Sequence, residues 1–327
     1  MGRVGLDRAL ALFAVPEADV AAVRAAADAV RRDPALAAWV GESTALLEVA
    51  MGSPSPGPTL PTHPLVAPSA AKPGPNGRSV RHSPQHVGSV GGPVGGDLAA
   101  YLPVVAFARV LPALLAGHEQ RGVPPRVTAD TLADVGRMLT RNRAWFGEAG
   151  IGDELTRWLS RHLYGALYQL GRLQYERRRL APGPGLELRQ AGFPCGPGNL
   201  VLDLHIPGAG GPLAPEAVDA SLAAARAFFR KRFPEERYAA VVCHSWLLDP
   251  QLATVLPASS NLVAFQRRLT LGGEPGDGDL SVRRFVWDDV VSPRELLPRD
   301  STLRRAVVDL WASGGHWHDR RGWLAWR

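Results

Sequence analysis

Apolar residues recur at helical spacing through most of the first half of the chain. Apolar positions three or four residues apart form one face of an α-helix, so each such stretch predicts a helix. At the start of one stretch Asp33 precedes Pro34, the order of an N-cap and a first-turn proline. The pattern predicts a helical N-terminal domain over residues 1–150. Its periodic stretches are 17–32, 33–50, 98–120 and 128–147, and a further helical stretch follows at 152–164.

One long segment interrupts the helical pattern. Residues 52–96 contain ten prolines and nine glycines and few large apolar side chains. Such a composition cannot bury enough surface to offset the conformational entropy that is lost on ordering. We therefore expect residues 52–96 to form a flexible insertion within the helical domain.

The periodicity changes from helix to strand after about residue 167. Residues 167–180 and 185–193 flank a Pro/Gly-rich sequence and predict a β-hairpin. A tryptophan-rich end predicts a tail strand that packs on the sheet. The order of elements predicts an α+β fold over residues 151–327, with a mixed β-sheet flanked by helices. The remaining elements are strands at 199–207, 238–246 and 280–287, a glycine-rich turn at 272–278, and helices at 215–233, 249–256, 259–269 and 293–312.

Composition narrows the class of protein. A chain of 327 residues with 46% hydrophobic content can bury a large core, and its length indicates about two domains. The net charge of +6 favours anionic partners. The basic runs at 176–180 and 230–233 are short and lack interleaved aromatic residues, which argues against nucleic acid as a partner. The two cysteines, Cys195 and Cys243, form neither a disulfide framework nor a zinc site.

The sequence also bears on location. Asp7 and Arg8 interrupt the short apolar stretch at the N-terminus, which is not typical of a secretion signal. The longest apolar run, residues 101–117, contains Arg109 and two prolines and is too short to span a bilayer. We therefore expect a cytoplasmic protein without a membrane partner. The sequence leaves the oligomeric state open.

The stretch LDLHIPGAGG, residues 202–211, is a buried-strand pattern that runs into a glycine-rich loop before a predicted helix. The loop has the pattern His-x-x-Gly-x-Gly from His205 to Gly210, and the chain has no GxxxxGK[ST] sequence. Glycines let backbone N–H groups approach a phosphate closely, and a helix N-terminus favours an anion. Residues 212–215 separate the glycines from the helix, which weakens the dipole contribution because that contribution fades within about one turn. The loop predicts a site for a phosphate-bearing ligand.

The order hairpin, strand, glycine loop, helix, strand, helix, strand resembles that of GNAT-type acyltransferases. In that family an [Arg/Gln]-x-x-Gly-x-Gly/Ala pattern holds the pyrophosphate of acyl-CoA. More particularly, the chain is similar to a two-domain bacterial family that pairs a helical N-acyltransferase N-terminal domain with a GNAT-like C-terminal domain. The resemblance covers all but the segment 52–96, and it is carried by the phrases LGRLQYE (170–176), LHIP (204–207), CHSWLLDPQL (243–252) and SSNLVAFQRR (259–268).

This resemblance implies an acyl-CoA-dependent N-acyltransferase in which an amine of unknown identity attacks the thioester directly. Acyl-CoA would be a co-substrate. The resemblance also implies that the following residues bind it: Ile206, Gly208, Ala209, Gly210, Gly211 and Asn261.

Two departures from the family pattern keep a second function open. His205 stands where the pattern has Arg or Gln, and no tyrosine follows Asn261 at the place of the general acid of many GNAT enzymes. The alternative is a non-catalytic GNAT-like module that senses a ligand or binds a partner protein through its helical half.

Direct acyl transfer needs a base for the amine, a donor for the thioester carbonyl and a proton for the leaving thiolate. His244 is the preferred base, because histidine titrates near neutrality and this one lies at a strand end. His205 is a second candidate base, or it pins the glycine loop. Ser245 either donates a proton to the thiolate or caps a helix that begins near Asp249. A structural histidine hydrogen-bonded in the core remains an equal alternative for both histidines.

Strand alternation restricts the other candidates, because successive side chains point to opposite faces. It places Leu202 and Leu204 opposite Asp203 and His205. It separates Cys243 from His244 in the same way, so covalent cysteine catalysis is excluded.

Two further groups are weaker candidates for a catalytic or metal-binding role. Glu176 could act as a base across the hairpin, but a solvated charged face explains it more simply. The sequence HWHD at 316–319 offers two histidines without a third ligand, so no metal site is predicted.

Overall fold

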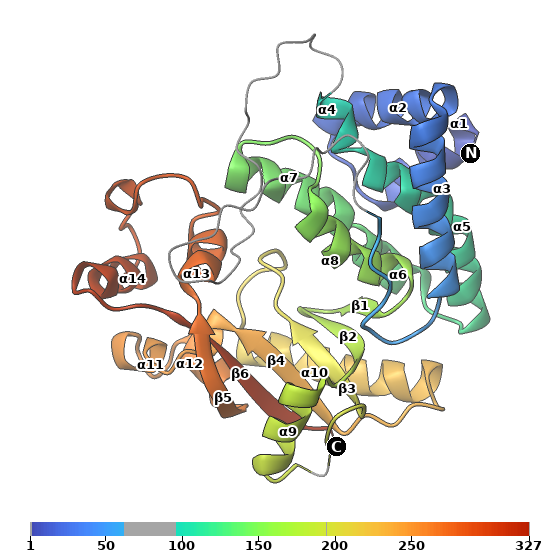
Figure 1. Cartoon of the computed structure of the whole chain (residues 1–327). Coiled ribbons are helices and arrows are strands. Elements are labelled where there is room, and N and C mark those ends of the chain that lie inside the picture. Colours follow the sequence, from blue (N-terminus) through green and yellow to red (C-terminus); the bar gives the residue numbers. More distant parts are fainter. Residues whose placement is uncertain (1, 62–95, 194, 327) are drawn as a thin grey trace.

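The computed structural model describes residues 2–61, 96–193 and 195–326, which form a helical part and a sheet part (Figure 1). In the described residues up to Leu163 the regular elements are helices, as the periodicity predicts. Asp33 caps α3 as expected, because its carboxylate accepts a hydrogen bond from the backbone N–H of Ala35 at 2.8 Å. The helices are α1 Arg3–Leu12, α2 Glu17–Arg32, α3 Pro34–Val49, α4 Gly96–Ala99, α5 Leu102–Gln120, α6 Pro125–Leu132, α7 Asp134–Phe146 and α8 Asp153–Leu163.

Helix α5 is the core of the helical part. Val104, Phe107 and Val110 are fully buried in it, among side chains from α1, α2, α3, α7 and α8. Among the described helices it is also the one that could cross a membrane by length and composition alone, and 61% of its apolar window is buried inside the protein. A helix that forms the centre of a soluble core has the same length and composition.

The second part is built on one six-stranded sheet of order β1-β2-β3-β4-β6-β5. Strands β3 and β4 pair in parallel and the other neighbouring strands pair antiparallel. The mixed sheet confirms the predicted α+β class. The strands are β1 Leu167–Leu170, β2 Leu173–Arg179, β3 Leu200–His205, β4 Ala240–Ser245, β5 Thr270–Asp277 and β6 His318–Ala325.

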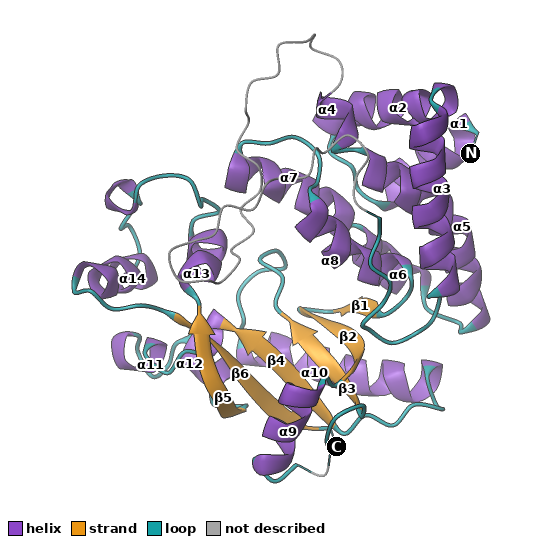
Figure 2. Ribbon diagram, viewed as in Figure 1, coloured by secondary structure: helices purple, strands orange, loops and turns teal. Residues whose placement is uncertain are grey.

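Helices cover both faces of the sheet, with α9 in front of it and α10 behind it in the view of Figure 2. Helix α10 buries one apolar stripe, which includes Val218, Leu222 and Phe229, against Leu202 and Leu204 of β3. Pro215 begins α10 and Arg230–Arg232 end it, as the helix dipole favours. The helices of this part are α9 Pro182–Gln190, α10 Pro215–Arg232, α11 Leu252–Val255, α12 Asn261–Gln266, α13 Asp279–Val286 and α14 Thr302–Ala312, with 3₁₀ turns at Trp246–Leu248 and Arg294–Leu296.

The hairpin predicted from residues 167–180 and 185–193 is wrong. Strands β1 and β2 form the hairpin by themselves, and its turn is Gly171–Arg172 between the paired residues Leu170 and Leu173. Gly171 has a φ of 69°, which favours glycine at this turn. The Pro/Gly sequence that follows starts α9 instead, because Pro182 has a fixed φ that suits the first turn of a helix.

The strand predicted at 280–287 is also wrong, since these residues lie mostly in α13, and the glycine-rich sequence before it lies in β5. Strand β5 is at the edge of the sheet, where a proline and a register shift between Gly272 and Gly276 are tolerated. A Cβ at Gly272 would lie 2.7 Å from the ring of Trp323, so glycine is required there. The helix predicted at 293–312 is confirmed only over α14.

The first residues of the expected insertion are packed rather than flexible. Ser55 is 2% exposed and bridges to β2. Its N–H donates to the carbonyl of Arg177 at 2.7 Å, and its carbonyl accepts from the N–H of Arg179 at 2.8 Å. The expectation of flexibility is therefore wrong for this short stretch, and residues 62–95 lie outside the described residues.

Arg177 ties the two parts of the chain together from within the sheet. The residue is 1% exposed, and its guanidinium donates to the carbonyls of Gly165 at 3.1 Å and Gly52 at 2.9 Å. The Nε atom donates to the Glu236 carboxylate at 2.9 Å, and the guanidinium lies 4.0 Å from the ring centroid of Phe233. One cation thus joins the helical part, the segment after α3 and the end of α10.

We predict that Arg177→Met destabilises the protein by about 3–5 kcal/mol, because it removes the cation paired with the half-buried Glu236 carboxylate, which keeps only the Tyr238 hydroxyl, and leaves two carbonyl oxygens without this donor. Arg179→Met on the same strand is the control, since the Arg179 guanidinium is exposed and, among the described contacts, donates only to the Gly198 carbonyl. The control should change stability by less than about 0.5 kcal/mol. Urea unfolding measures both, and equal losses for the two variants would contradict the role given to Arg177.

Candidate active site

The ladder between β2 and β3 gathers polar side chains on one face of the sheet. Gln174 lies opposite His205 and Glu176 lies opposite Asp203. Directly opposite residues of an antiparallel pair point to the same face, so these four side chains lie together. Leu202 and Leu204, two residues apart on β3, point to the other face and pack on α10. The alternation predicted for β3 is confirmed.

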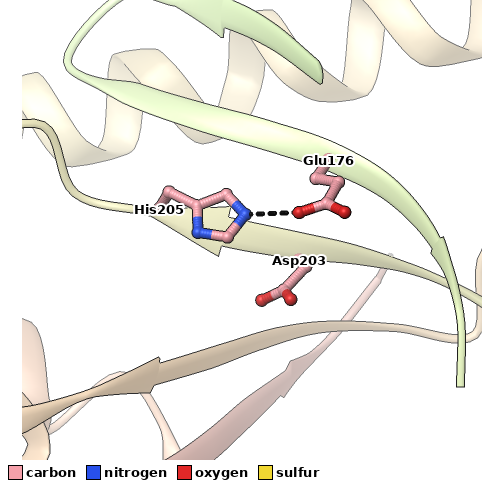
Figure 3. A group of neighbouring side chains, drawn as sticks. All are labelled: Glu176, Asp203 and His205. Atoms are coloured by element: carbon pink, nitrogen blue, oxygen red, sulfur yellow. Dashed lines mark hydrogen bonds and ion pairs between the residues drawn. The ribbon is translucent and has the colours of Figure 1, made fainter. Parts of the chain in front are cut away.

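His205 and Glu176 form a hydrogen-bonded pair at the centre of this face (Figure 3). The His205 Nε2 and the Glu176 Oε2 atoms are 2.8 Å apart. An ionised carboxylate accepts only, so the pair favours the tautomer in which Nε2 carries the proton and Nδ1 keeps its lone pair. A histidine oriented in this way by a carboxylate is the arrangement of a general base.

Glu176 is 1% exposed, so its interpretation as part of a solvated charged face is wrong. Burial raises the pKa of this carboxyl, but hydrogen bonding and charge from His205, together with Arg161 and Ser55, outweigh burial and lower the pKa to about 2. Glu176 is therefore a carboxylate at neutral pH. The sequence could not show this, because the burial comes from elements far away along the chain.

The helical part provides one wall of the site through α8. The indole of Trp158 meets the His205 ring edge to face, with the ring centroids 4.8 Å apart. The Arg161 Nε atom lies 3.4 Å from the Glu176 Oε1 atom. Trp158 is itself held by Asp134 of α7, whose Oδ2 accepts from the indole N–H at 3.2 Å. The orientation of His205 thus depends on both parts of the chain.

Asp203 completes a group that also contains Glu176 and His205 (Figure 3). One possible ligand atom from each of the three lies within 4.8 Å of the others, a spacing that could hold a metal ion. Arginines already neutralise the two carboxylates, since Arg178 is 2.5 Å from Asp203 Oδ2 and Arg161 approaches Glu176.

The second candidate histidine lies at the end of the neighbouring strand β4. The parallel ladder stops at the pair Leu204 and Cys243, although β3 continues to His205 and β4 to Ser245. His244 points to the same face as His205, is exposed, and lies opposite Arg321 of β6. In the described part of the chain no carboxylate is hydrogen-bonded to His244, in contrast to His205.

The two residues on either side of His244 behave differently. The Ser245 Oγ accepts from the N–H of Leu247 at 3.1 Å, so this serine caps the 3₁₀ turn Trp246–Leu248 and not a helix that begins near Asp249. Burial raises the pKa of the Cys243 thiol far above its usual range, and Asp203 adds to the shift. A thiol that stays protonated is a poor nucleophile, which agrees with the exclusion of cysteine catalysis.

The glycine loop lies directly after His205. Gly208 to Gly211 are exposed, and Gly210 and Gly211 have φ values of 96° and 81° that only glycine adopts readily. Ile206 is half-buried against the core below α10, and Ala209 is exposed. Helix α10 begins only at Pro215, so the glycines precede the helix as the sequence indicated.

Two arginines that the sequence analysis did not single out flank this loop. Arg172, in the β1–β2 turn, donates to the carbonyls of Pro207 at 2.9 Å and Pro212 at 3.3 Å and so bridges the two ends of the loop. Arg141 of α7 lies against Gly208, because a Cβ there would be only 2.0 Å from its guanidinium. The loop is therefore bordered by positive charge from both parts of the chain.

Asn261, the remaining residue predicted at the cofactor, is the first residue of α12. Arg268, two residues after α12 ends, donates to the Pro215 carbonyl at 3.3 Å and pairs with Asp219 of α10. These contacts lie beyond the C-terminal end of α12, whereas Asn261 begins the helix.

The two histidines of HWHD each contact a carboxylate. His316 Nδ1 lies 2.9 Å from Asp279 Oδ2, and His318 Nδ1 lies 3.4 Å from Asp249 Oδ2. Trp317 between them is almost fully buried and Trp323 lies in β6, which confirms that the tail tryptophans pack the last strand. These contacts anchor the start of β6.

Comparison with known proteins agrees with this geometry. Residues 5–165 match the N-acyltransferase N-terminal domain and residues 167–324 match the GNAT-like C-terminal domain. A solved acyltransferase in complex with decanoyl-CoA is 33% identical, with a TM-score of 0.77 over 97% of this chain and 86% of that chain. An acyltransferase in complex with decanoyl-CoA and teicoplanin is 33% identical, with a TM-score of 0.75 over the same shares of the two chains. A third structure, of an acyltransferase in complex with CoA and 10C-teicoplanin, is 32% identical, with a TM-score of 0.76 over 99% of this chain and 88% of that chain. The search of curated proteins found no match.

The fold and these similarities define an acyltransferase with a GNAT-like domain. The chain belongs to the two-domain family that joins an N-acyltransferase N-terminal domain to a GNAT-like C-terminal domain. It is an acyl-CoA-dependent N-acyltransferase with coenzyme A thioester as co-substrate. The alternative of a non-catalytic module is not favoured, because acyltransferases resemble the chain over nearly its full length.

The lowered pKa of Glu176 predicts how stability depends on pH. The folded state holds the proton less tightly than the unfolded state, whose carboxyl titrates at about 4.5. The stabilisation by ionised Glu176 is therefore present above pH 4.5 and is lost as the pH falls towards 2. A depression of this size corresponds to about 3 kcal/mol. Urea unfolding of wild type and Glu176→Gln should show a stability gap at pH 6 that narrows towards pH 3, whereas a gap independent of pH would contradict the assignment.

Proposed function

We propose that His205 is the general base of this N-acyltransferase and that Glu176 orients it. The observation that carries the proposal is the 2.8 Å contact between His205 Nε2 and the buried Glu176 carboxylate. The carboxylate fixes the tautomer and stabilises the imidazolium that forms when the base accepts a proton. His244, which the sequence favoured as the base, interacts with the charge of Asp319 but has no carboxylate hydrogen-bonded to it among the described residues, and it is the second candidate.

The proposed reaction proceeds by direct attack. The amine nitrogen of the acceptor forms a C–N bond to the thioester carbon, and His205 Nδ1 takes the proton that the nitrogen loses. The tetrahedral intermediate then collapses, the C–S bond breaks and its electron pair leaves on sulfur. The proton returns from the imidazolium to the thiolate, so the products are an amide and free coenzyme A. Ser245, at the end of the adjacent strand, has a hydroxyl that can relay this proton.

The glycine loop is the proposed site of the coenzyme A pyrophosphate. Residues 208–211 are exposed, so the backbone of this loop can approach an anion, as in other phosphate loops. Arg172 holds the two ends of the loop together, and Arg141 places a guanidinium beside Gly208. Two cations at the loop compensate for the distance between the glycines and the start of α10.

We further propose that the acceptor is an amine on a glycopeptide. Two of the similar structures are described as complexes with teicoplanin or 10C-teicoplanin, and each resembles this chain over nearly its full length. The arginine contacts to Asp203 and Glu176 favour a reaction without a metal ion. Action in the cytoplasm remains a proposal from the sequence.

We predict that His205→Asn lowers kcat about 10²–10⁴-fold, the usual contribution of a general base, and leaves the Kd for acyl-CoA unchanged. Glu176→Gln should lower kcat less and change its pH profile, because an amide cannot stabilise an imidazolium as a carboxylate does. His244→Asn is the matched control and should keep most of the activity. A large loss in His244→Asn with little loss in His205→Asn would transfer the role of base to His244.

The phosphate site is tested by calorimetric titration with coenzyme A, acetyl-CoA and a long-chain acyl-CoA. Gly210→Glu should abolish binding, because it adds a carboxylate beside the pyrophosphate and strains a backbone with a φ of 96°. Gly192→Glu is the control, since Gly192 has a φ of 84° and open space around it but lies at the end of α9. Absence of binding to the wild type would refute the proposed function, whereas equal binding to both variants would place the pyrophosphate elsewhere.

A further inference from the structure

Gln174 is buried beside the proposed base but its amide nitrogen has no partner. The residue is 1% exposed, and its Nε2 atom is buried without a hydrogen bond to any described residue. Buried donors in folded proteins are almost always paired, so an unpaired one at a functional site requires an explanation. Neither the mechanism above nor the phosphate site uses this side chain.

The position of Gln174 is set by the sheet. It lies directly opposite His205 in the β2–β3 ladder and two residues before Glu176, so all three side chains share one face. Opposite residues have Cβ atoms about 5 Å apart, and a glutamine side chain can therefore reach a group bound next to the His205 ring.

We infer that the Gln174 amide donates a hydrogen bond to the carbonyl oxygen of the acyl thioester and to the oxyanion that forms from it. The inference rests on the proposed function. When His205 Nδ1 accepts the proton of the attacking amine, the thioester carbon must lie within bonding distance of that amine. Its oxygen then lies near His205, and among the described residues the side chain directly opposite His205 in the ladder, Gln174, has an amide donor without a partner. The negative charge that develops on this oxygen strengthens the hydrogen bond in the transition state.

The neighbouring strand contains a matched glutamine for comparison. Gln169 of β1 lies opposite Gln174 in the β1–β2 ladder and shares its face. Its Nε2 donates to the carbonyls of Gly171 at 2.7 Å and Leu173 at 3.3 Å, so this amide is satisfied within the protein. Two glutamines on adjacent strands thus differ in whether the amide donor has a partner.

The first test compares turnover with thermal stability. Gln174→Met should lower kcat about 10²–10³-fold, as for the loss of one oxyanion donor, while its melting temperature stays equal to the wild type or rises. Gln169→Met should show the opposite pattern, with a lower melting temperature and nearly full turnover of the folded protein. A Gln174→Met variant that keeps its turnover, or that loses stability as Gln169→Met does, would overturn the inference.

The second test observes the hydrogen bond directly in the absence of acceptor. Infrared difference spectra of bound octanoyl-CoA labelled with ¹³C at the thioester carbonyl should show a lowered carbonyl stretch in the wild type. The shift should be lost in Gln174→Met and retained in Gln169→Met. If octanoyl-CoA fails to bind the wild type, the proposed function itself is wrong. If it binds and the band is the same in the wild type and Gln174→Met, only the role of Gln174 is refuted.

Discussion

The structure depends on how strand β2 presents two consecutive residues to opposite faces of the sheet. Glu176 points to the face of the site and fixes His205, and Arg177 points to the other side and joins the helical part to the end of α10. Both side chains are buried and charged, and each is stable there only because its partners are in place. The geometry of the site and the connection between the two parts of the chain therefore rest on one strand.

Local sequence patterns, over a few neighbouring residues, predicted much of this fold. The helices of the first part and the apolar stripe of α10 follow from apolar residues three or four positions apart. The two faces of β3, with Leu204 in the core and His205 at the site, follow from simple alternation. The glycine loop follows from the pattern of a buried strand that runs into glycines before a predicted helix, and Gly210 there has the positive φ that favours glycine.

The remainder depended on contacts between residues far apart in the sequence. Glu176 was misread because its burial comes from α8 and from the residues around Ser55, which the local sequence does not reveal. Arg141 could not be linked to the loop, since it lies 67 positions before Gly208 in the sequence. The Pro/Gly sequence before α9 was misread for a different reason, because proline starts helices as well as turns.

The edge-to-face contact between Trp158 and His205 has a consequence for how such enzymes diversify. The ring that would abstract the proton belongs to the GNAT-like domain, whereas the aromatic surface that borders it belongs to α8 of the helical part. A chimera that exchanges the helical half between relatives would therefore also exchange the surroundings of the histidine. The helical part and the GNAT-like domain therefore cannot change independently at this contact.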